Sequence, residues 1–357
     1  MKMLLNQSAC EANLFPFSKT RHVAECRVGI LTISEKWKKL LPANSQIVLH
    51  QTGSENVLSL PANIIPTPGN IDYLLECAQN GDIPKASDEV RYIHHPWDLF
   101  QLNDWAIRKD FEYLTRDRIS QPIKNAVVVN PENIFVEEGA VLLHCTLNAS
   151  TGPIYIGKNA EIMEGSVIRG PFALCESGRV KLATKVYGAT TVGPHSVIGG
   201  EVNNSVLFGY SNKGHDGFLG NAVLGEWCNI GADSNNSNLK NNYEDVRLWS
   251  YETEAFEKTG LQFCGLMMGD HSKCGINTMF NTGTVVGVSA NIFGAGFPRN
   301  FVPSFSWGGA AGFTIYMTKK AFETARLVMS RRGVDFDEKE AAILQHVFEE
   351  TKIWRKE

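Results

Sequence analysis

One histidine of this chain lies among small residues that would leave its side chain exposed. His215 occurs in the stretch SNKGHDGFLGN, residues 211–221, with Lys213 two positions upstream. Because imidazole titrates near neutral pH, a histidine can take the proton of an attacking nucleophile. Two interpretations of His215 follow, a surface residue without a role or the general base of an active site.

The histidine lies within a region of six-residue repeats. Positions 156, 162, 168, 174, 180, 186, 192 and 198 read Ile, Ile, Ile, Leu, Val, Val, Val and Ile. Further runs at the same spacing are Leu224 and Ile230, then Met268, Cys274, Phe280, Val286 and Ile292. A six-residue step is one short strand with a turn, and three steps make a triangular coil that must stack on others to bury its aliphatic residues. The pattern predicts a parallel β-helix, because a β-sandwich would alternate with period two.

The repeat is interrupted twice. Between Ile198 and Leu224 the spacing slips by two residues, and the slip contains His215. A longer interruption, 240–264, follows Ile230. Irregular loops of solenoid proteins often lie on the binding face, so this position favours a functional role for His215.

Residues 1–95 have a different pattern, which predicts a small α/β domain. A strand leading into a helix is expected at 27–41 and a second strand at 45–50. A helix is expected at 70–81, where a glycine would cap its C-terminus.

Helical segments are expected on both sides of the repeats. We expect a helical linker at 96–133, the β-helix at 134–300, and a loop followed by helices at 301–357. Within the last segment, Asp337 and Glu340 predict a capping box. The helix that they begin would cover the open end of the solenoid.

Composition limits the classes of function. The net charge is −4 with mixed signs and no long basic run, which argues against nucleic acid as a partner. The eight cysteines form no CxxC pair, so no zinc or redox motif is indicated, and their irregular spacing fits a reducing cytosol. No apolar run resembles a signal peptide or a membrane span, so we expect a cytoplasmic protein without a membrane partner.

The repeats and their motifs resemble those of the left-handed β-helix acyltransferases. The resemblance is closer to the bifunctional enzymes that join a nucleotidyltransferase domain to a glucosamine-1-phosphate acetyltransferase domain. The stretch NLFPFSKTRHVAECRVGILTISEKW, residues 13–37, looks like the start of a divergent bacterial branch named as sugar nucleotidyltransferases. This resemblance implies a left-handed β-helix, a reduced nucleotidyltransferase-like domain at 1–95, acetyl-CoA as co-substrate and a homotrimer.

The family's site residues map onto HDGFLGNAVLGEWCNIGADSNNSN, residues 215–238. His215 takes the position of the catalytic histidine, so the resemblance implies that it is the general base. Gly231 and Ala232 take the positions of a Gly-Ala pair whose backbone faces acetyl-CoA in the family. The residues expected to bind the substrate are Lys213, Phe218, Asn229 and Asn238.

These residues predict an acetyl-CoA-dependent N-acetyltransferase acting on an amino sugar phosphate or a nucleotide-linked amino sugar. The attacking amine must lose a proton, a backbone amide or asparagine can stabilise the oxyanion, and no metal is required. A second hypothesis is a sugar-1-phosphate nucleotidyltransferase. Residues 1–95 contain no G-x-G-T-R loop to hold phosphates, although Arg21 stands near its place.

Two further hypotheses use the same scaffold. One is a non-catalytic sugar-nucleotide-binding or assembly protein, because a fold alone does not establish an activity. The other is a zinc enzyme of the carbonic anhydrase type, which needs three converging histidines. The spacing of His195, His215 and His271 does not match that pattern.

Overall fold

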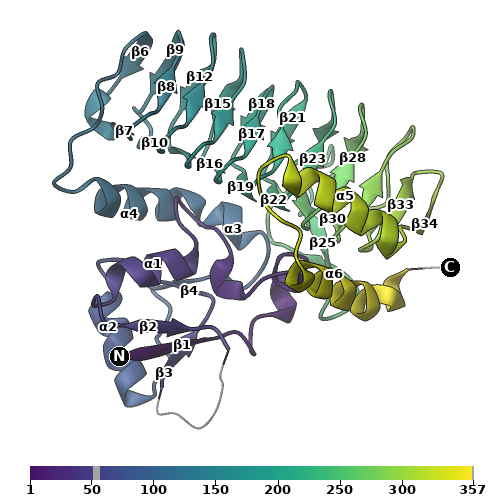
Figure 1. Cartoon of the computed structure of the whole chain (residues 1–357), viewed down its shortest axis with the longest axis horizontal. Coiled ribbons are helices and arrows are strands. Elements are labelled where there is room, and N and C mark those ends of the chain that lie inside the picture. The colour runs from purple at the N-terminus through teal and green to yellow at the C-terminus, as the bar shows by residue number, and fades with distance from the viewer. Residues whose placement is uncertain (51–56, 356–357) are drawn as a thin grey trace.

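The computed structural model describes residues 1–50 and 57–355 of the chain. Short strands stack into a solenoid, which runs along the upper side of the molecule in Figure 1. The strands lie in three sheets of nine, ten and six strands, which we call the nine-strand, ten-strand and six-strand faces.

The strands of each face follow one another along the chain. The nine-strand face contains β7 (Ile134–Val136), β10 (Ile154–Ile156), β13 (Phe172–Leu174), β16 (Thr190–Val192), β19 (Val206–Gly209), β22 (Val223–Glu226), β27 (Leu266–Met268), β30 (Thr284–Val286) and β32 (Phe301–Val302). The ten-strand face contains β8 (Val141–Leu142), β11 (Glu161–Ile162), β14 (Arg179–Val180), β17 (Val197–Ile198), β20 (Asn212–Lys213), β23 (Asn229–Ile230), β28 (Lys273–Cys274), β31 (Asn291–Ile292), β33 (Ser306–Gly309) and β34 (Gly312–Ile315). The six-strand face contains β6 (Ala126–Val129), β9 (Cys145–Asn148), β12 (Val167–Arg169), β15 (Lys185–Tyr187), β18 (Glu201–Asn203) and β21 (Phe218–Gly220), and the pair β24 (Asn235–Asn236) and β29 (Met279–Phe280) follows it.

The aliphatic residues of the repeat form ladders inside the solenoid. Ile156, Leu174, Val192 and Leu207 are aligned in neighbouring parallel strands and are fully buried. Burial of such a side chain contributes about 1.5–3 kcal/mol, so the ladders hold the coils together. The predicted fold class is confirmed. The chain is mainly β, with a left-handed parallel β-helix, a small N-terminal α/β part and C-terminal helices.

The slip in the repeat near His215 consists of shortened turns and not of an inserted loop. Ile198 pairs with Lys213, and Val202 pairs with Leu219, so the step from Ile198 to Val202 takes four residues. The tight turn contains Gly200 at φ +72°, where a Cβ atom would meet the backbone of the next coil. The shortened turn changes the register, and Lys213 therefore enters the interior ladder.

One segment interrupts the solenoid as expected, and another differs from the prediction. The interruption 240–264 forms an antiparallel hairpin of β25 (Arg247–Ser250) and β26 (Ala255–Lys258). The segment expected to be a loop at 301–312 continues the solenoid through β32 and β33 and then turns back in β34. Its repeat is hidden in the sequence because Gly308 occupies the position of the aliphatic residue.

The N-terminal part has a parallel sheet in the order β2-β1-β3. Its elements are β1 (Lys2–Asn6), α1 (Ile33–Leu40), β2 (Gln46–Val48), β3 (Leu58–Pro61), β4 (Ile64–Ile65), α2 (Ile71–Asn80) and β5 (Arg91–Tyr92). The glycine cap of α2 is confirmed, since Gly81 has φ +75°. The strand expected before α1 is absent from the described residues, because the backbone amides of Ile30 and Leu31 donate to the carboxylate of Asp110 instead of to a neighbouring strand.

This N-terminal part packs against the nine-strand face. One hydrophobic cluster joins Phe17 and Trp37 with Phe208, Met267 and Val285 of the solenoid. The helices α3 (Asp98–Gln101) and α4 (Asn103–Thr115) extend the contact along the solenoid (Figure 1). The nine-strand face is therefore covered by the chain itself.

The C-terminal segment contains α5 (Thr318–Ser330) and α6 (Glu338–Glu350), and α5 lies in front of the last coils in Figure 1. Asp337 accepts a hydrogen bond of 2.8 Å from the backbone amide of Glu340, which forms half of the expected capping box. The Glu340 carboxylate instead faces His271 at 3.2 Å. Within the described ranges, no helix combines the length and apolar character needed to cross a bilayer.

Candidate functional site

His215 lies on the turn between β20 and β21, where the chain passes from the ten-strand face to the six-strand face. Its side chain is exposed. Among the described residues, no hydrogen bond or ion pair engages the imidazole. Both of its nitrogens therefore remain available to a ligand.

Lys213, expected to bind the substrate, lies inside the solenoid and is 1% exposed. Its ammonium donates to the carbonyls of Gly199 at 3.1 Å, Asp216 at 3.2 Å and His215. Burial lowers the pKa of Lys213 to about 8, and the nearby Asp216 opposes this shift. The side chain is thus enclosed below the His215 turn and binds the backbone of that turn.

Two of the expected residues come together on the six-strand side of the turn. The backbone amide of Phe218 donates to Asn235 Oδ1 at 2.8 Å, and Asn238 Nδ2 donates to Asn221 Oδ1 at 2.8 Å. Gly220 lies between the Phe218 ring and the Asn238 amide, so a Cβ atom there would clash with both. Phe218 and Asn238 therefore share one small area next to the turn.

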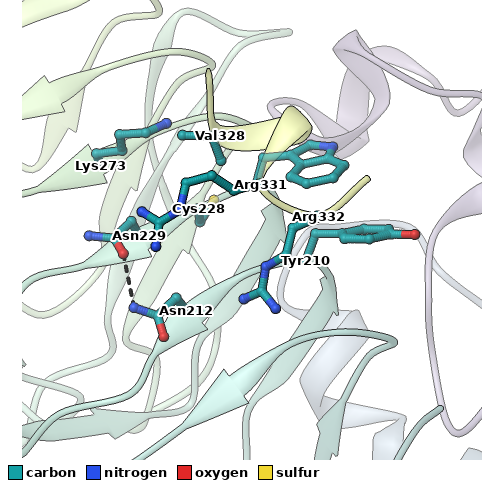
Figure 2. A pocket seen from close by; sticks show the side chains of 9 residues that line it. Tyr210, Asn212, Cys228, Asn229, Lys273, Val328, Arg331 and Arg332 are labelled. Atoms are coloured by element: carbon teal, nitrogen blue, oxygen red, sulfur yellow. Dashed lines mark hydrogen bonds between the residues drawn. The ribbon is translucent and has the colours of Figure 1, made fainter. Parts of the chain in front are cut away.

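The other expected residues lie on the ten-strand side. Asn229 Oδ1 accepts a hydrogen bond of 2.9 Å from Asn212 Nδ2, as Figure 2 shows. The backbone amide of Gly231 donates to Cys274 at 3.1 Å, and the Ala232 carbonyl accepts from Asn277 at 2.8 Å. These backbone groups already take part in coil stacking, while the Asn229 side chain faces outward.

A cavity of about 590 Å³ borders Asn229 and lies under the C-terminal end of α5. Its lining residues are Tyr210, Asn212, Trp227, Cys228, Asn229, Lys273, Val328, Arg331 and Arg332 (Figure 2). Burial lowers the pKa of Lys273 to about 8. The sequence does not indicate this cavity, because its lining comes from coils and a helix far apart in the chain. The only local signal was the pair of arginines after α5.

Tyr210 and Trp227, which line the cavity, belong to a column of four stacked rings. The ring centroids are 4.7 Å apart for His195 and Tyr210, 4.2 Å for Tyr210 and Trp227, and 6.2 Å for Trp227 and His271. All four residues occupy the same corner with φ between 52° and 60°. His215 lies at another corner, so the three histidines considered for zinc do not converge within this chain.

The N-terminal cations contact acidic groups of the same chain. Arg21, which stands near the place of a phosphate loop, forms an ion pair with Asp270 and lies 3.4 Å from Glu226. Lys19 forms an ion pair with Glu350 of α6. These contacts join the N-terminal part to the solenoid and to the last helix.

Comparisons with known proteins show that the chain is similar to several transferases. A family described as "Sugar nucleotidyl transferase" matches residues 3–55. The "Bifunctional protein GlmU" of Methanocaldococcus jannaschii is 27% identical over 202 residues, which are 55% of this chain and 41% of that protein. The "Uncharacterized acetyltransferase YaiX" of Escherichia coli is 23% identical over 172 residues, 47% of this chain and 72% of that protein. The chain spans less than half the length of the GlmU relatives.

Solved structures resemble the chain only loosely. The polySia specific acetyltransferase NeuO has a TM-score of 0.31 at 14% identity, and the match covers 58% of this chain and 98% of that one. The UDP-N-acetylglucosamine acyltransferase from Campylobacter jejuni has a TM-score of 0.33 at 13% identity, and covers 66% and 85%. In its repeats, its N-terminal match and its curated relatives, the chain is similar to the hexapeptide-repeat acyltransferases of the GlmU type.

Proposed function

We propose that this protein is an acetyl-CoA-dependent N-acetyltransferase that acts on an amino sugar phosphate or a nucleotide-linked amino sugar. The observation that carries the proposal is an exposed His215 on a turn whose backbone binds a buried ammonium. A general base must be accessible to the substrate and must also be held in place. The relatives named as acetyltransferases support the same class of reaction.

His215 acts as the general base in the proposed reaction. The imidazole takes a proton from the amine as the amine nitrogen attacks the thioester carbonyl carbon. The new C–N bond forms, the C–S bond breaks, and the imidazolium returns its proton to the leaving thiolate. The products are an acetamide and free coenzyme A, and the histidine is regenerated.

Asn229 supplies a donor for the oxyanion of the tetrahedral intermediate. Its Oδ1 accepts from Asn212, so its Nδ2 is directed away from that partner (Figure 2). A preorganised amide donor next to a developing negative charge stabilises the transition state. Phe218 and Asn238, on the other side of the turn, contact the acceptor sugar in this proposal.

Lys213 acts as a positioning residue. Its ammonium donates to the carbonyl oxygens of His215 and Asp216 from inside the solenoid. These bonds hold the backbone on both sides of the imidazole. An enclosed ammonium cannot contact the sugar directly. In this proposal, positioning of the His215 turn therefore replaces the substrate-binding role that the sequence predicts for Lys213.

We expect a homotrimer, because neighbouring solenoids of such enzymes share their active sites. The nine-strand face is covered by the N-terminal part, so the subunits would meet through the other two faces. Val127, Val129 and Val167 of the six-strand face are exposed and could form that contact. Light scattering at working concentration should give three times the chain mass, and a monomer would contradict this assembly.

The test of the function compares His215→Asn with a matched variant, His144→Asn. His144 is also exposed and lies on the same corner of an earlier coil, between β8 and β9. A panel of amino-sugar phosphates and nucleotide-linked amino sugars first identifies the accepted amine by thiol release. His215→Asn should slow acetyl transfer about 10²–10⁴-fold, the usual contribution of a positioned base, and His144→Asn should not. A His215→Asn rate within threefold of wild type would reject the assignment.

A further inference from the structure

The cavity under α5 contains an excess of positive charge. Arg331, Arg332 and Lys273 line it, and its lining includes no aspartate or glutamate. Over residues 1–50 and 57–355, neither arginine forms a salt bridge. The chain has a net charge of −4, so three cations around one cavity of about 590 Å³ are a local feature and not a general property of the surface.

The arginines lie at the end of α5 and extend over the ten-strand face, as Figure 2 shows. Arginine presents a planar fork of donors that matches the oxygens of a phosphate group. Lys273 lies opposite them on β28, with its ammonium held at 2.9 Å by the His271 carbonyl. Groups from two sides of the cavity can therefore contact one polyphosphate.

The remaining lining suits a flat, polar ring. Tyr210 and Trp227 stack on each other at 4.2 Å, so each ring covers a face of the other and the column presents ring edges to the cavity. A heteroaromatic base can pack its face against such edges. The Asn212 amide adds hydrogen-bonding groups beside the rings.

We propose that this cavity binds a nucleoside phosphate, namely the phosphorylated adenosine end of the acyl-CoA donor. The inference rests on the proposed function, because that reaction requires a thioester of coenzyme A. Asn212 borders the cavity and lies three residues before His215, which is at most about 10 Å for a fully extended chain. The pantetheine arm would follow β20 from the cavity to the turn.

Calorimetric titration of the full chain tests the proposal. The probes are coenzyme A, 3′-dephospho-coenzyme A, pantetheine and UDP-N-acetylglucosamine, at fixed salt. The variant Arg331→Gln/Arg332→Gln is compared with Lys319→Gln/Lys320→Gln, which removes two exposed cations from the start of the same helix. The arginine variant should bind coenzyme A about 10- to 100-fold more weakly, as expected for lost charge-assisted hydrogen bonds. The lysine variant should bind it as wild type does, and pantetheine should bind both equally.

Two outcomes would overturn the proposal. Equal affinity of the arginine variant and wild type for coenzyme A would exclude the cavity as the phosphate site. If only UDP-N-acetylglucosamine required the arginines, the cavity would bind a nucleotide sugar and the donor assignment would be wrong. Titration of His215→Asn separates this inference from the proposed function, since that variant should bind coenzyme A normally. Arginine-dependent binding together with an active His215→Asn would reject the base and keep the cavity.

Discussion

Two regions of this molecule have cationic side chains beside a cavity, and these side chains have different partners in the two regions. In the N-terminal part, Lys19 and Arg21 border a cavity of about 880 Å³, but both form ion pairs with acids from distant parts of the chain. Under α5, Arg331 and Arg332 border a cavity without an acidic residue. Similar residue types thus join parts of the chain in one region and remain available to an anion in the other. The presence of a basic residue near the place of a phosphate loop does not make a phosphate site.

The largest effect is expected when the acid that pairs with Arg21 is removed. Asp270→Ala would leave a buried guanidinium without its closest partner and would remove the acceptor for Thr20 and for the Glu226 amide. We expect a loss of about 3–5 kcal/mol in the free energy of unfolding, measured by denaturant titration. The control, Asp88→Asn, removes the charge of a fully exposed partner of Arg91 and should leave the free energy of unfolding almost unchanged. Equal losses in the two variants would show that Arg21 does not join the N-terminal part to the solenoid.

The second prediction concerns a buried cation that pairs with backbone carbonyls instead of an acid. Burial lowers the pKa of Lys213 from 10.5 to about 8, so between these values the unfolded chain binds more protons than the folded one. Folding is therefore more favourable as the pH rises from about 8 to 10.5, by up to ~3 kcal/mol. The stability difference between wild type and Lys213→Met should change by this amount in favour of wild type over that range.

The same variant also tests the proposed role of Lys213 as a positioning residue. Lys213→Met keeps an unbranched side chain that is one atom shorter in the interior ladder but removes the donors to the His215 and Asp216 carbonyls. We expect kcat for acetyl transfer to fall while the affinity for coenzyme A stays the same. A stability difference that does not vary with pH, or an unchanged kcat, would contradict this role.

The smallest expected effect is on the stability of the arginine variant. Arg331→Gln/Arg332→Gln should change the free energy of unfolding by less than about 0.5 kcal/mol per site, because both side chains are exposed and form no salt bridge among the described residues. Thermal melts of this variant and Asp270→Ala, recorded in one buffer without ligand, should therefore differ widely. A large destabilisation by the arginine variant would mean that these cations are also structural.

Much of the fold could be predicted because its signals are local. Every aliphatic residue of the run from Ile156 to Ile198 lies in the solenoid interior, since a six-residue step specifies one strand and one turn without reference to the rest of the chain. The glycine cap at Gly81 and the N-cap at Asp337 depend on backbone groups within four residues. The sequence indicates His215 as a candidate for a similar local reason, because this histidine lies between glycines.

The roles of other residues depend on the tertiary structure. The sequence predicts Lys213 as a substrate-binding residue, but the short turn at Gly199–Gly200 shifts the register and places its side chain in the solenoid interior. The cavity combines Asn212 with Arg331, and Arg21 finds Asp270 across 249 positions of the chain. The repeat pattern of the sequence does not predict such contacts, because they depend on how whole coils and helices pack. The sequence by itself therefore determined the repeating scaffold and its turns, and packing decided which cations are buried, which are paired and which face a cavity.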